Sequence, residues 1–258
     1  MLMSSKLVDF NIPELKLMTK EPKELFYIGN RDLINRKMVS IVGTRRPCNY
    51  TKDFTFKLAQ ALAKRGVTIV SGAAMGVDAI AHRGATPSNT IAVMANGLNI
   101  KYPAVNRNLI ADIEKNGLTL SFYKDGFRAT KWSFVARNEL VVALGSILIV
   151  TEADLNSGSL RSVEFALKMQ KDIYVLPHRL GESLGTNDLL EKGLAKPIYN
   201  IEEFANQFGK IVEEKDDFLN YLKEKRTVNE AISKFGNRVY EAELEGLIAI
   251  KNGYIITL

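Results

Sequence analysis

The feature that most constrains the fold is a regular alternation of short apolar runs with longer segments of helical periodicity. The apolar runs end at glycine or polar residues, and we expect them to be strands within 38–43, 67–72, 89–97, 118–122, 146–153 and 171–177. The segments between them carry apolar residues at helical spacing, such as Phe54, Leu58 and Leu62. Strands that alternate with helices form a parallel sheet covered on both faces. The sequence therefore predicts an α/β fold with a mostly parallel sheet and helices on both faces.

The pattern changes after about residue 208, where short helical segments are followed by a predicted hairpin. Helices are expected within 216–225, 227–236 and 237–250, and Asn252-Gly253 is the two-residue turn of the hairpin. Three helices and a hairpin are typical of a winged helix. We predict three parts: a lead-in over residues 1–37, a Rossmann-like domain over 38–208 and a winged-helix-like domain over 216–258.

The charge is unevenly divided along the chain. Residues 1–201 hold 27 Lys and Arg against 18 Asp and Glu, and residues 202–258 hold 8 against 11, which agrees with the totals of 35 and 29. A basic body favours a polyanionic partner, although a solvated basic surface without a partner has the same composition. The single cysteine, Cys48, excludes an intrachain disulfide and fits a reducing cytoplasm. We expect no membrane partner, because no apolar stretch is long enough to span a bilayer and the N-terminus lacks a secretory pattern.

Most catalytic motifs are missing from the sequence. No Cys/His metal spacing, phosphate-binding P-loop, dinucleotide glycine motif or nucleophile elbow is present. His82 falls within a helical pattern and is expected in the core, whereas His178 follows a strand, where it can meet a ligand. Glu152 and Asp154 are spaced for acid–base chemistry, but we favour a role in capping a helix or orienting loops. We predict no catalytic residues, no metal and no cofactor.

Phosphate-binding chemistry is abundant at the ends of the predicted strands, the edge where parallel sheets bind ligands. Backbone N–H groups and hydroxyls of the Ser157-Gly158-Ser159 turn at a helix start suit an oxyanion, although Ser157 also fits a plain N-cap. Arg45 and Arg46 lie in the loop that follows the first predicted strand, and guanidinium groups bind phosphate through bidentate hydrogen bonds. The alternative is that one of these arginines pairs with Glu152 or Asp78. Further along the chain, Arg137 and Asn138 follow Trp132 and Phe134, rings that either stack on bases or pack in the core.

Several of these segments together resemble one family. VGTRRP (42–47), SGAAMGVDAIAH (71–82), FVARNELVVALG (134–145), VTEADLNSGSLRSVEFALK (150–168) and LGTNDLL (184–190) resemble the DprA/Smf family of DNA-processing proteins, over about residues 38–195. The resemblance implies a homodimeric, non-enzymatic protein whose extended, Rossmann-like domain binds single-stranded DNA and helps load RecA recombinase onto it during natural transformation. With the single cysteine, we expect it in the cytoplasm. The resemblance also implies that the following residues bind DNA or its phosphates: Gly43, Thr44, Arg45, Arg137, Asn138, Ser157, Gly158, Ser159, Gly185, Thr186 and Asn187. We add Arg46, Ser71 and Gly72 to the predicted site, because they lie in the same strand-end loops.

Some residues depart from the family pattern or leave the function open. Glu139 stands where a second basic residue often follows Arg-Asn, and Arg161 stands where the family usually has an apolar or hydroxyl residue. The predicted recognition helix carries Glu241, Glu243 and Glu245 against Arg238, so we expect the C-terminal domain to contact protein rather than duplex DNA. Two alternatives remain: a nucleoside-monophosphate phosphoribohydrolase-like enzyme that uses Glu152, and a scaffold that only bridges partners.

Overall fold

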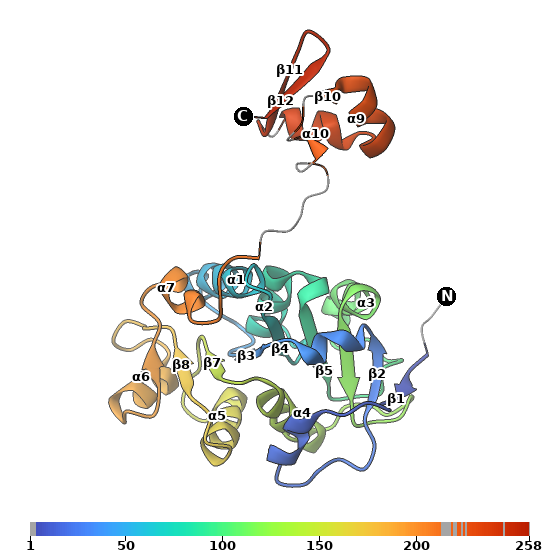
Figure 1. Ribbon diagram of the computed structural model, residues 1–258. Helices are drawn as coiled ribbons and strands as arrows, with labels where there is room; N and C mark the ends of the chain where they lie inside the picture. Colours follow the sequence, from blue (N-terminus) through green and yellow to red (C-terminus); the bar gives the residue numbers. More distant parts are fainter. Residues whose placement is uncertain are drawn as a thin grey trace. The chain divides into compact units, whose positions relative to one another are not determined.

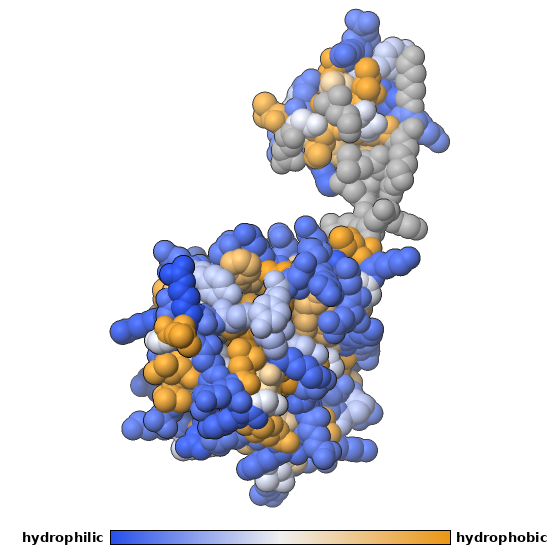
Figure 2. Space-filling model, turned by 90° about the vertical axis from the view of Figure 1, so that its left-hand side faces the viewer, coloured by the Kyte–Doolittle hydropathy of each residue, from blue (hydrophilic) through white to orange (hydrophobic). Residues whose placement is uncertain are grey.

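The computed structural model describes residues 4–212, 218, 221, 222, 224, 226–244 and 246–257. The chain divides into two compact units (Figure 1), the first ending at Ile211 and the second beginning at Val212. Each unit has its own hydrophobic core, and the face of the first unit drawn in Figure 2 is mostly hydrophilic. Within the described residues, no helix has both the length and the apolar character needed to cross a membrane.

The first unit is built on a nine-stranded sheet (Figure 1). Its strands are β1 (Lys6–Leu7), β2 (Phe26–Gly29), β3 (Met38–Val42), β4 (Thr68–Ser71), β5 (Thr90–Met94), β6 (Leu118–Ser121), β7 (Leu148–Val150), β8 (Ile173–Val175) and β9 (Lys196–Pro197). They lie in the order β1-β2-β6-β5-β4-β3-β7-β8-β9. The seven strands from β3 to β9 pair in parallel, whereas β1 and β2 are antiparallel additions at one edge. The predicted mostly parallel α/β fold is confirmed.

Helices cover both faces of this sheet. They are α1 (Asn49–Ala63), α2 (Val77–Ala85), α3 (Arg107–Asn116), α4 (Lys131–Leu144), α5 (Gly158–Lys168), α6 (Leu184–Glu191) and α7 (Ile201–Asn206). Figure 1 shows α1, α2, α3 and α7 on one side and α4 and α5 on the other. Short 3-10 helices lie at Pro13–Leu17, Arg31–Asn35, Pro87–Asn89 and Ala104–Asn106.

The side chains of β3 show how the sheet joins the two helical layers. Val39 and Ile41 pack in the cluster formed with α1 and α2, whereas Met38 and Val42 pack in the cluster formed with α4. Full burial of such a side chain contributes about 1.5–3 kcal/mol relative to exposure. The one polar residue of the strand, Ser40, is buried, and its Oγ donates to the carbonyl of Val141 at 2.6 Å. The strand is therefore buried on both faces with its polar group satisfied.

The N-terminal segment belongs to the sheet domain, which differs from the lead-in predicted for residues 1–37. β2 pairs with β6 along its whole length and places Tyr27 and Ile28 in the core. Leu33, in the following 3-10 helix, is fully buried. The segment covers the edge of β6, which would otherwise present unpaired backbone groups to solvent. β2 is an apolar run that ends at Gly29, but only a short 3-10 helix separates it from β3. It therefore lies outside the alternation of strands with long helical segments, and the predicted boundary at residue 38 lies too late.

The strand order reverses between β3 and β7. From β3 the chain adds β4, β5 and β6 on one side, and then crosses to add β7, β8 and β9 on the other. The loops that leave the carboxyl ends of β3 and β7 consequently diverge to opposite sides and leave a crevice between them, which is where open α/β sheets bind ligands.

The second unit contains a three-stranded antiparallel sheet and two described helices. Its elements are β10 (Arg226–Thr227), α9 (Val228–Phe235), α10 (Arg238–Leu244), β11 (Ile248–Lys251) and β12 (Tyr254–Thr257), with sheet order β10-β12-β11. The predicted turn joins β11 to β12, and Asn252 and Gly253 have φ values of 50° and 78°, as a type I′ turn requires. Most of the helix predicted over 216–225, and Glu245, lie outside the described residues. The winged-helix assignment of this unit stays a prediction.

Candidate nucleic-acid interface

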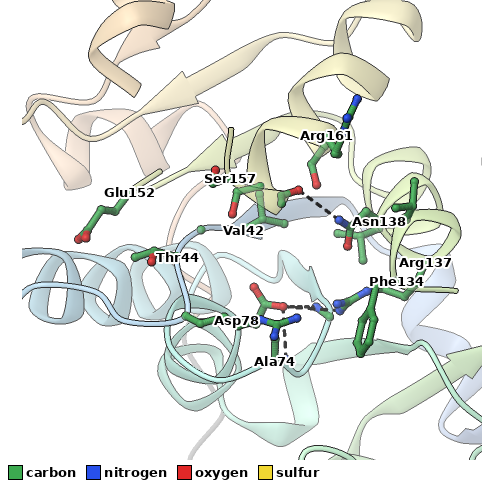
Figure 3. Close-up of a pocket in the computed structure, with 18 of the residues that line it drawn as sticks. Val42, Thr44, Ala74, Asp78, Phe134, Arg137, Asn138, Glu152, Ser157 and Arg161 are labelled. Carbon is green, nitrogen blue, oxygen red and sulfur yellow. Dashed lines mark hydrogen bonds and ion pairs between the residues drawn. The ribbon is translucent and has the colours of Figure 1, made fainter. Parts of the chain in front are cut away.

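A cleft of about 650 Å³ opens at the crevice between β3 and β7. Its walls are the loops that follow β3, β4 and β7 and the first turns of α4 and α5 (Figure 3). The structure brings ten of the predicted site residues into this one lining: Gly43, Thr44, Arg45, Arg46, Gly72, Arg137, Asn138, Ser157, Gly158 and Ser159. The predicted convergence of the strand-end loops on one cleft therefore holds for these residues.

The loop after β3 is fixed from two sides. The Thr44 N–H donates to the Glu152 carbonyl at 2.8 Å, and the Thr44 carbonyl accepts from the Val77 N–H at 3.1 Å. A Cβ at position 43 would lie 2.7 Å from Val77 and 3.0 Å from the Glu152 carbonyl, so only glycine fits between α2 and the loop after β7. The close packing at Gly43 holds the backbone that presents Arg45 at the mouth of the cleft.

Arg45 and Arg46 are both exposed, and neither forms an ion pair with a described residue. The Arg45 guanidinium carbon lies 5.5 Å from the centre of the Phe134 ring. The proposed partner Glu152 instead accepts a hydrogen bond from the Cys48 N–H at 3.0 Å, which agrees with the loop-orienting role favoured for this carboxylate. Since both guanidinium groups are solvated and unpaired within the described part of the chain, they can bind an anion.

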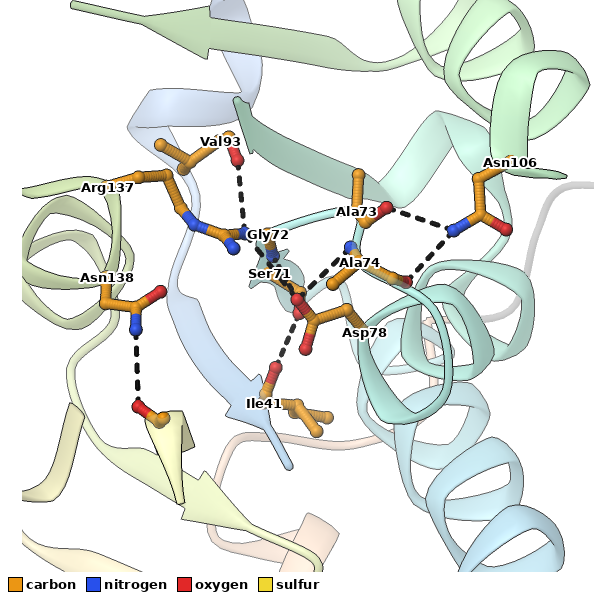
Figure 4. Close-up of polar contacts among 11 residues, drawn as sticks. Ile41, Ser71, Gly72, Ala73, Ala74, Asp78, Val93, Asn106, Arg137 and Asn138 are labelled. Carbon is orange, nitrogen blue, oxygen red and sulfur yellow. Dashed lines mark hydrogen bonds and ion pairs between the residues drawn. The ribbon is translucent and has the colours of Figure 1, made fainter. Parts of the chain in front are cut away.

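Arg137 lies at the floor of the cleft. The sequence predicts that it binds phosphate together with Asn138, but the structure buries its guanidinium. Its side chain is 5% exposed, and its Nη1 lies 3.6 Å from Oδ2 of Asp78 and donates to the Val93 carbonyl at 3.4 Å (Figure 4). A Cβ on Gly72 would lie 1.1 Å from this Nη1. A buried guanidinium requires a carboxylate partner, and Asp78 therefore pairs with Arg137 rather than with Arg45.

The Asp78 carboxylate is held by several donors. Its Oδ2 accepts from the N–H groups of Gly72 at 3.2 Å and Ala74 at 3.3 Å, in addition to the contact with Arg137. Burial raises the pKa of Asp78, while Arg137 and these backbone donors oppose the rise. Burial also lowers the pKa of Arg137, which Asp78 opposes. The floor is thus an ion pair of opposite charges, and the free positive charge of the cleft comes from its rim.

Ser71 was expected to bind DNA, but the structure places it beneath the floor. It is buried, and its Oγ donates to the Ile41 carbonyl at 2.7 Å (Figure 4). Ser71 is the last residue of β4, and its hydrogen bond to Ile41 joins β4 to β3.

The turn before α5 forms the opposite wall. Ser157 is the N-cap residue by position, but its Oγ makes no capping hydrogen bond and has no partner among the described residues. Gly158 is exposed, and a Cβ there would meet open space. Asn138 donates from Nδ2 to the Gly158 carbonyl at 3.4 Å and so ties α4 to α5. In the first turn of α5 the Leu160 N–H donates to the Ser157 carbonyl at 3.1 Å, whereas the N–H groups of Gly158 and Ser159 precede the first intrahelical acceptors, and such groups suit an anion.

The 185–187 turn does not line the cleft, contrary to expectation. Gly185 and Thr186 are buried, and the Gly185 N–H donates to the Ala153 carbonyl at 2.8 Å. Asn187 donates from Nδ2 to the carbonyls of Arg179 and Glu182. Residues 185–187 belong to the first turn of α6, and the hydrogen bonds from the Gly185 and Thr186 N–H groups to the Ala153 carbonyl attach this turn to the loop after β7.

Two cationic residues of the lining are absent from the predicted site. Lys131 is exposed at the first position of α4 and forms no ion pair with a described residue, and Arg161 is exposed and pairs with Glu164 at 3.0 Å. Arg161 had been noted only as a departure from the family pattern. The signal for Lys131 was its position at a helix start at the carboxyl edge of the sheet.

The remaining residues singled out in the sequence have structural roles or lie at the surface. His82 is fully buried with Nδ1 2.5 Å from Oγ1 of Thr90, as the core interpretation predicts. His178 contacts the Thr151 carbonyl through Nε2 at 2.8 Å and does not line the cleft. Phe134 is half-buried in the cleft wall, whereas Trp132 is 60% exposed and so is not a core residue.

Comparisons with known proteins agree with this fold. The family model described as DNA recombination-mediator protein A matches residues 7–209. The protein Smf of Synechocystis is 38% identical over 198 residues, which is 74% of this chain and 50% of the relative. DNA processing protein DprA of Streptococcus pneumoniae is 36% identical over 191 residues, 72% of this chain and 67% of that protein. The chain thus spans about half the length of the Smf relative.

Solved structures show the same relationship. DNA processing protein A from Helicobacter pylori, whose single-stranded DNA binding mode has been described, aligns with a TM-score of 0.77 and 44% identity over 80% of this chain and 97% of that chain. DprA from Streptococcus pneumoniae aligns with a TM-score of 0.73 and 33% identity over 80% of this chain and 74% of that one. The chain therefore belongs to the DNA recombination-mediator protein A family, as the resemblance in its strand-end loops implied.

Proposed function

We propose that the chain is a DNA-processing protein that binds single-stranded DNA in the cleft between β3 and β7. One observation carries the proposal: three exposed cations, Arg45, Arg46 and Lys131, surround a cleft of about 650 Å³ and have no ion-pair partner among the described residues. The Helicobacter pylori relative, 44% identical, is described by its binding of single-stranded DNA, which supports the same ligand here.

The lining suits a sugar–phosphate chain. The Arg45 and Arg46 guanidinium groups offer bidentate contacts to phosphate oxygens, and the first turn of α5 offers backbone N–H groups. The half-buried Phe134 ring offers a surface on which a base stacks. Contacts to phosphate and stacking on a ring do not read base edges, so we expect little sequence preference.

The wider role is part of the same proposal. We infer that the protein binds DNA as a homodimer in the cytoplasm, takes part in natural transformation and passes the bound strand to RecA, without catalysing a reaction. The acidic side chains Glu241 and Glu243 on α10, against Arg238, support a protein partner for the second unit. The handover is tested by measuring single-strand-dependent ATP hydrolysis by RecA on DNA coated with a single-strand-binding protein, with and without this protein.

The enzymatic alternative predicts release of free base from nucleoside monophosphates, with Glu152 as the acting carboxylate. The hydrogen bond from the Cys48 N–H to Glu152 Oε2 favours a structural role for this group. Incubation with nucleoside monophosphates followed by chromatography separates the two functions, because free base would contradict the non-catalytic proposal.

Binding itself is tested with Arg45→Ala and a labelled thymidine oligonucleotide. Loss of a charge-assisted hydrogen bond costs about 1.5–3 kcal/mol, so affinity should fall about tenfold or more. The slope of log K against log salt should shrink by about 0.7, the value for one phosphate of a single strand. Fluorescence anisotropy across salt concentrations measures both quantities.

The matched control for this experiment is Arg83→Ala. Arg83 is also exposed, but it lies in the last turn of α2, and α2 begins at the cleft and runs away from it. The variant removes the same charge without touching the cleft, and binding should change little. If Arg45→Ala and Arg83→Ala bind the oligonucleotide equally well, the cleft is not the DNA site.

A further inference from the structure

Three aromatic side chains form a surface cluster beside the cleft. The rings of Tyr123 and Phe127 are stacked, with centres 4.2 Å apart and planes 13° apart. The Trp132 ring meets both edge-on, at 5.6 Å from Tyr123 and 5.7 Å from Phe127. Tyr123 and Phe127 are half-buried, but Trp132 is 60% exposed. We call these three residues the aromatic platform.

The loop that carries Tyr123 and Phe127, two of the three rings of the platform, is held in a fixed shape. The Phe127 carbonyl accepts from the Gly97 N–H at 2.9 Å, and the Gly126 N–H donates to Oδ1 of Asn99 at 2.8 Å. The Asn99 N–H donates back to Oδ1 of Asp125 at 3.3 Å. These bonds join the loop after β6 to the loop after β5, so the rings do not need to be ordered when a ligand arrives.

The platform lies at the same edge of the sheet as the cleft. β6 is parallel to β5 and, through β4, to β3, so the loop after β6 leaves the same carboxyl edge as the loop that carries Arg45. Three strand steps separate β3 from β6, about 14 Å at ordinary strand spacing. Helix α4 connects the cleft to the platform directly, because Lys131 lines the cleft and Trp132 is the next residue of α4.

The charges around the platform match a polyanion. Lys131 and Arg128 are exposed and form no ion pair with a described residue, and Lys124 is exposed and contacts Glu24 at 3.3 Å. Rings that alternate with solvated cations are the pattern of sequence-tolerant surfaces for single strands, where bases stack and phosphates are neutralised. A protein partner with an acidic surface would use the charges but would not require an exposed indole packed against two rings of a fixed loop.

We propose that the aromatic platform is a second binding site for the same strand, on which a base stacks against Trp132 after the strand leaves the cleft near Lys131. The inference rests on the proposed function, because it assigns a path to the strand held in the cleft. The protein would then bind a longer stretch of DNA than the cleft alone can hold. Helix α4 would contribute a ring to each site, Phe134 in the cleft and Trp132 outside it.

The chain reports on this site without a label, because Trp132 is its only tryptophan. Thymidine oligonucleotides of increasing length are titrated while tryptophan emission and, in parallel, anisotropy of labelled DNA are recorded. Oligonucleotides that only fill the cleft should bind without changing the emission, and longer ones should quench it as a base stacks on the indole. Quenching by the shortest oligonucleotide that binds, or no quenching at any saturating length, would overturn the proposal.

Variants separate stacking from general damage to the fold. Trp132→Ala should bind long oligonucleotides about tenfold more weakly, the effect of losing one stacked base, and short ones as the unchanged protein does. Trp132→Phe keeps a ring and should recover most of the loss. The control is Tyr199→Ala, which removes an 84% exposed ring beyond β9, at the other end of the strand order.

The two proposals fail in different ways. If no oligonucleotide of any length binds, the proposed function fails and the platform has no strand to receive. If short oligonucleotides bind through Arg45 but Trp132→Ala binds long ones normally, only the platform is wrong.

Discussion

The rim and the floor of the cleft use the same side chain in opposite ways. At the rim, Arg45 and Arg46 are exposed and form no ion pair with a described residue, whereas at the floor Arg137 is 5% exposed and contacts Asp78. A solvated guanidinium is stable without a partner and stays free to bind an anion. A buried one must be paired, and breaking such a pair is costly. The comparison teaches that the arginines of the cleft have two roles: the exposed ones at the rim can bind an anion, and the buried, paired one at the floor stabilises the fold.

The largest expected effect concerns the floor. Asp78→Ala leaves Arg137 buried without its carboxylate and also leaves the N–H groups of Gly72 and Ala74 without an acceptor. We expect the free energy of unfolding of the first unit to fall by about 3–5 kcal/mol. Urea unfolding followed by the emission of Trp132, which lies in this unit, measures the change.

Two further variants show whether the unpaired charge causes the loss. Asp78→Asn keeps the shape and an acceptor and should lose less stability. Combining Asp78→Ala with Arg137→Met removes the unpaired guanidinium and should recover part of the lost free energy of unfolding. The two backbone N–H groups stay unpaired, so the recovery is incomplete. Wild-type stability in Asp78→Ala would break the distinction between rim and floor.

A smaller effect is the pH dependence from His82, which packs near the floor. Burial lowers its pKa to about 3 from the ordinary 6.5, with additional lowering by Arg137 and Arg83. Between these values the unfolded chain binds a proton that the folded protein does not. The stability from this residue is therefore complete above pH 6.5 and is lost as the pH falls, by about 1.4 kcal/mol for each pH unit.

His82→Leu isolates this contribution. The Thr90 hydroxyl still donates to the Ile69 carbonyl at 2.8 Å, so the substitution leaves no unpaired hydroxyl. The unfolding free energy of the variant should fall less steeply between pH 6.5 and pH 4 than that of the unchanged chain. If the unfolding free energies of the variant and the unchanged chain fell in parallel with pH, His82 would bind a proton equally well in the folded and the unfolded protein.

The parallel sheet was predictable because most of its strands are apolar runs that alternate with segments of helical periodicity. Length does not distinguish them from β2, which has four residues where β7 and β8 have three; β2 was missed because only a short 3-10 helix separates it from β3. β2 is defined by its pairing with β6, far along the chain. Contacts of that range leave no local periodicity in the sequence.

The candidate site was predictable at the level of loops but not of individual roles. Arg45 and Arg137 both follow apolar segments. The neighbouring sequence does not show that the Arg45 side chain is exposed, whereas the Arg137 side chain is buried against Gly72 and pairs with Asp78. The 185–187 turn looked equivalent to the 157–159 turn, because both are short runs of glycine and polar residues before a helix. Only the packing of Gly185 against the Ala153 carbonyl separates a supporting turn from a wall of the cleft.

The smallest expected effect completes the comparison. The double variant Arg45→Ala, Arg46→Ala removes two charges from the rim, and its free energy of unfolding should stay within about 0.5 kcal/mol of the unchanged chain. The only contact at stake that the described structure shows for these guanidinium groups is that of Arg45 with the Phe134 ring at 5.5 Å, which is worth about 0.5–1 kcal/mol at an exposed site. Removing Arg45 also relieves its repulsion of Arg137, whose pKa it lowers, and this offsets part of the loss. The same urea experiment measures the result, and a loss as large as that of Asp78→Ala would show that the rim arginines hold the fold as the floor does.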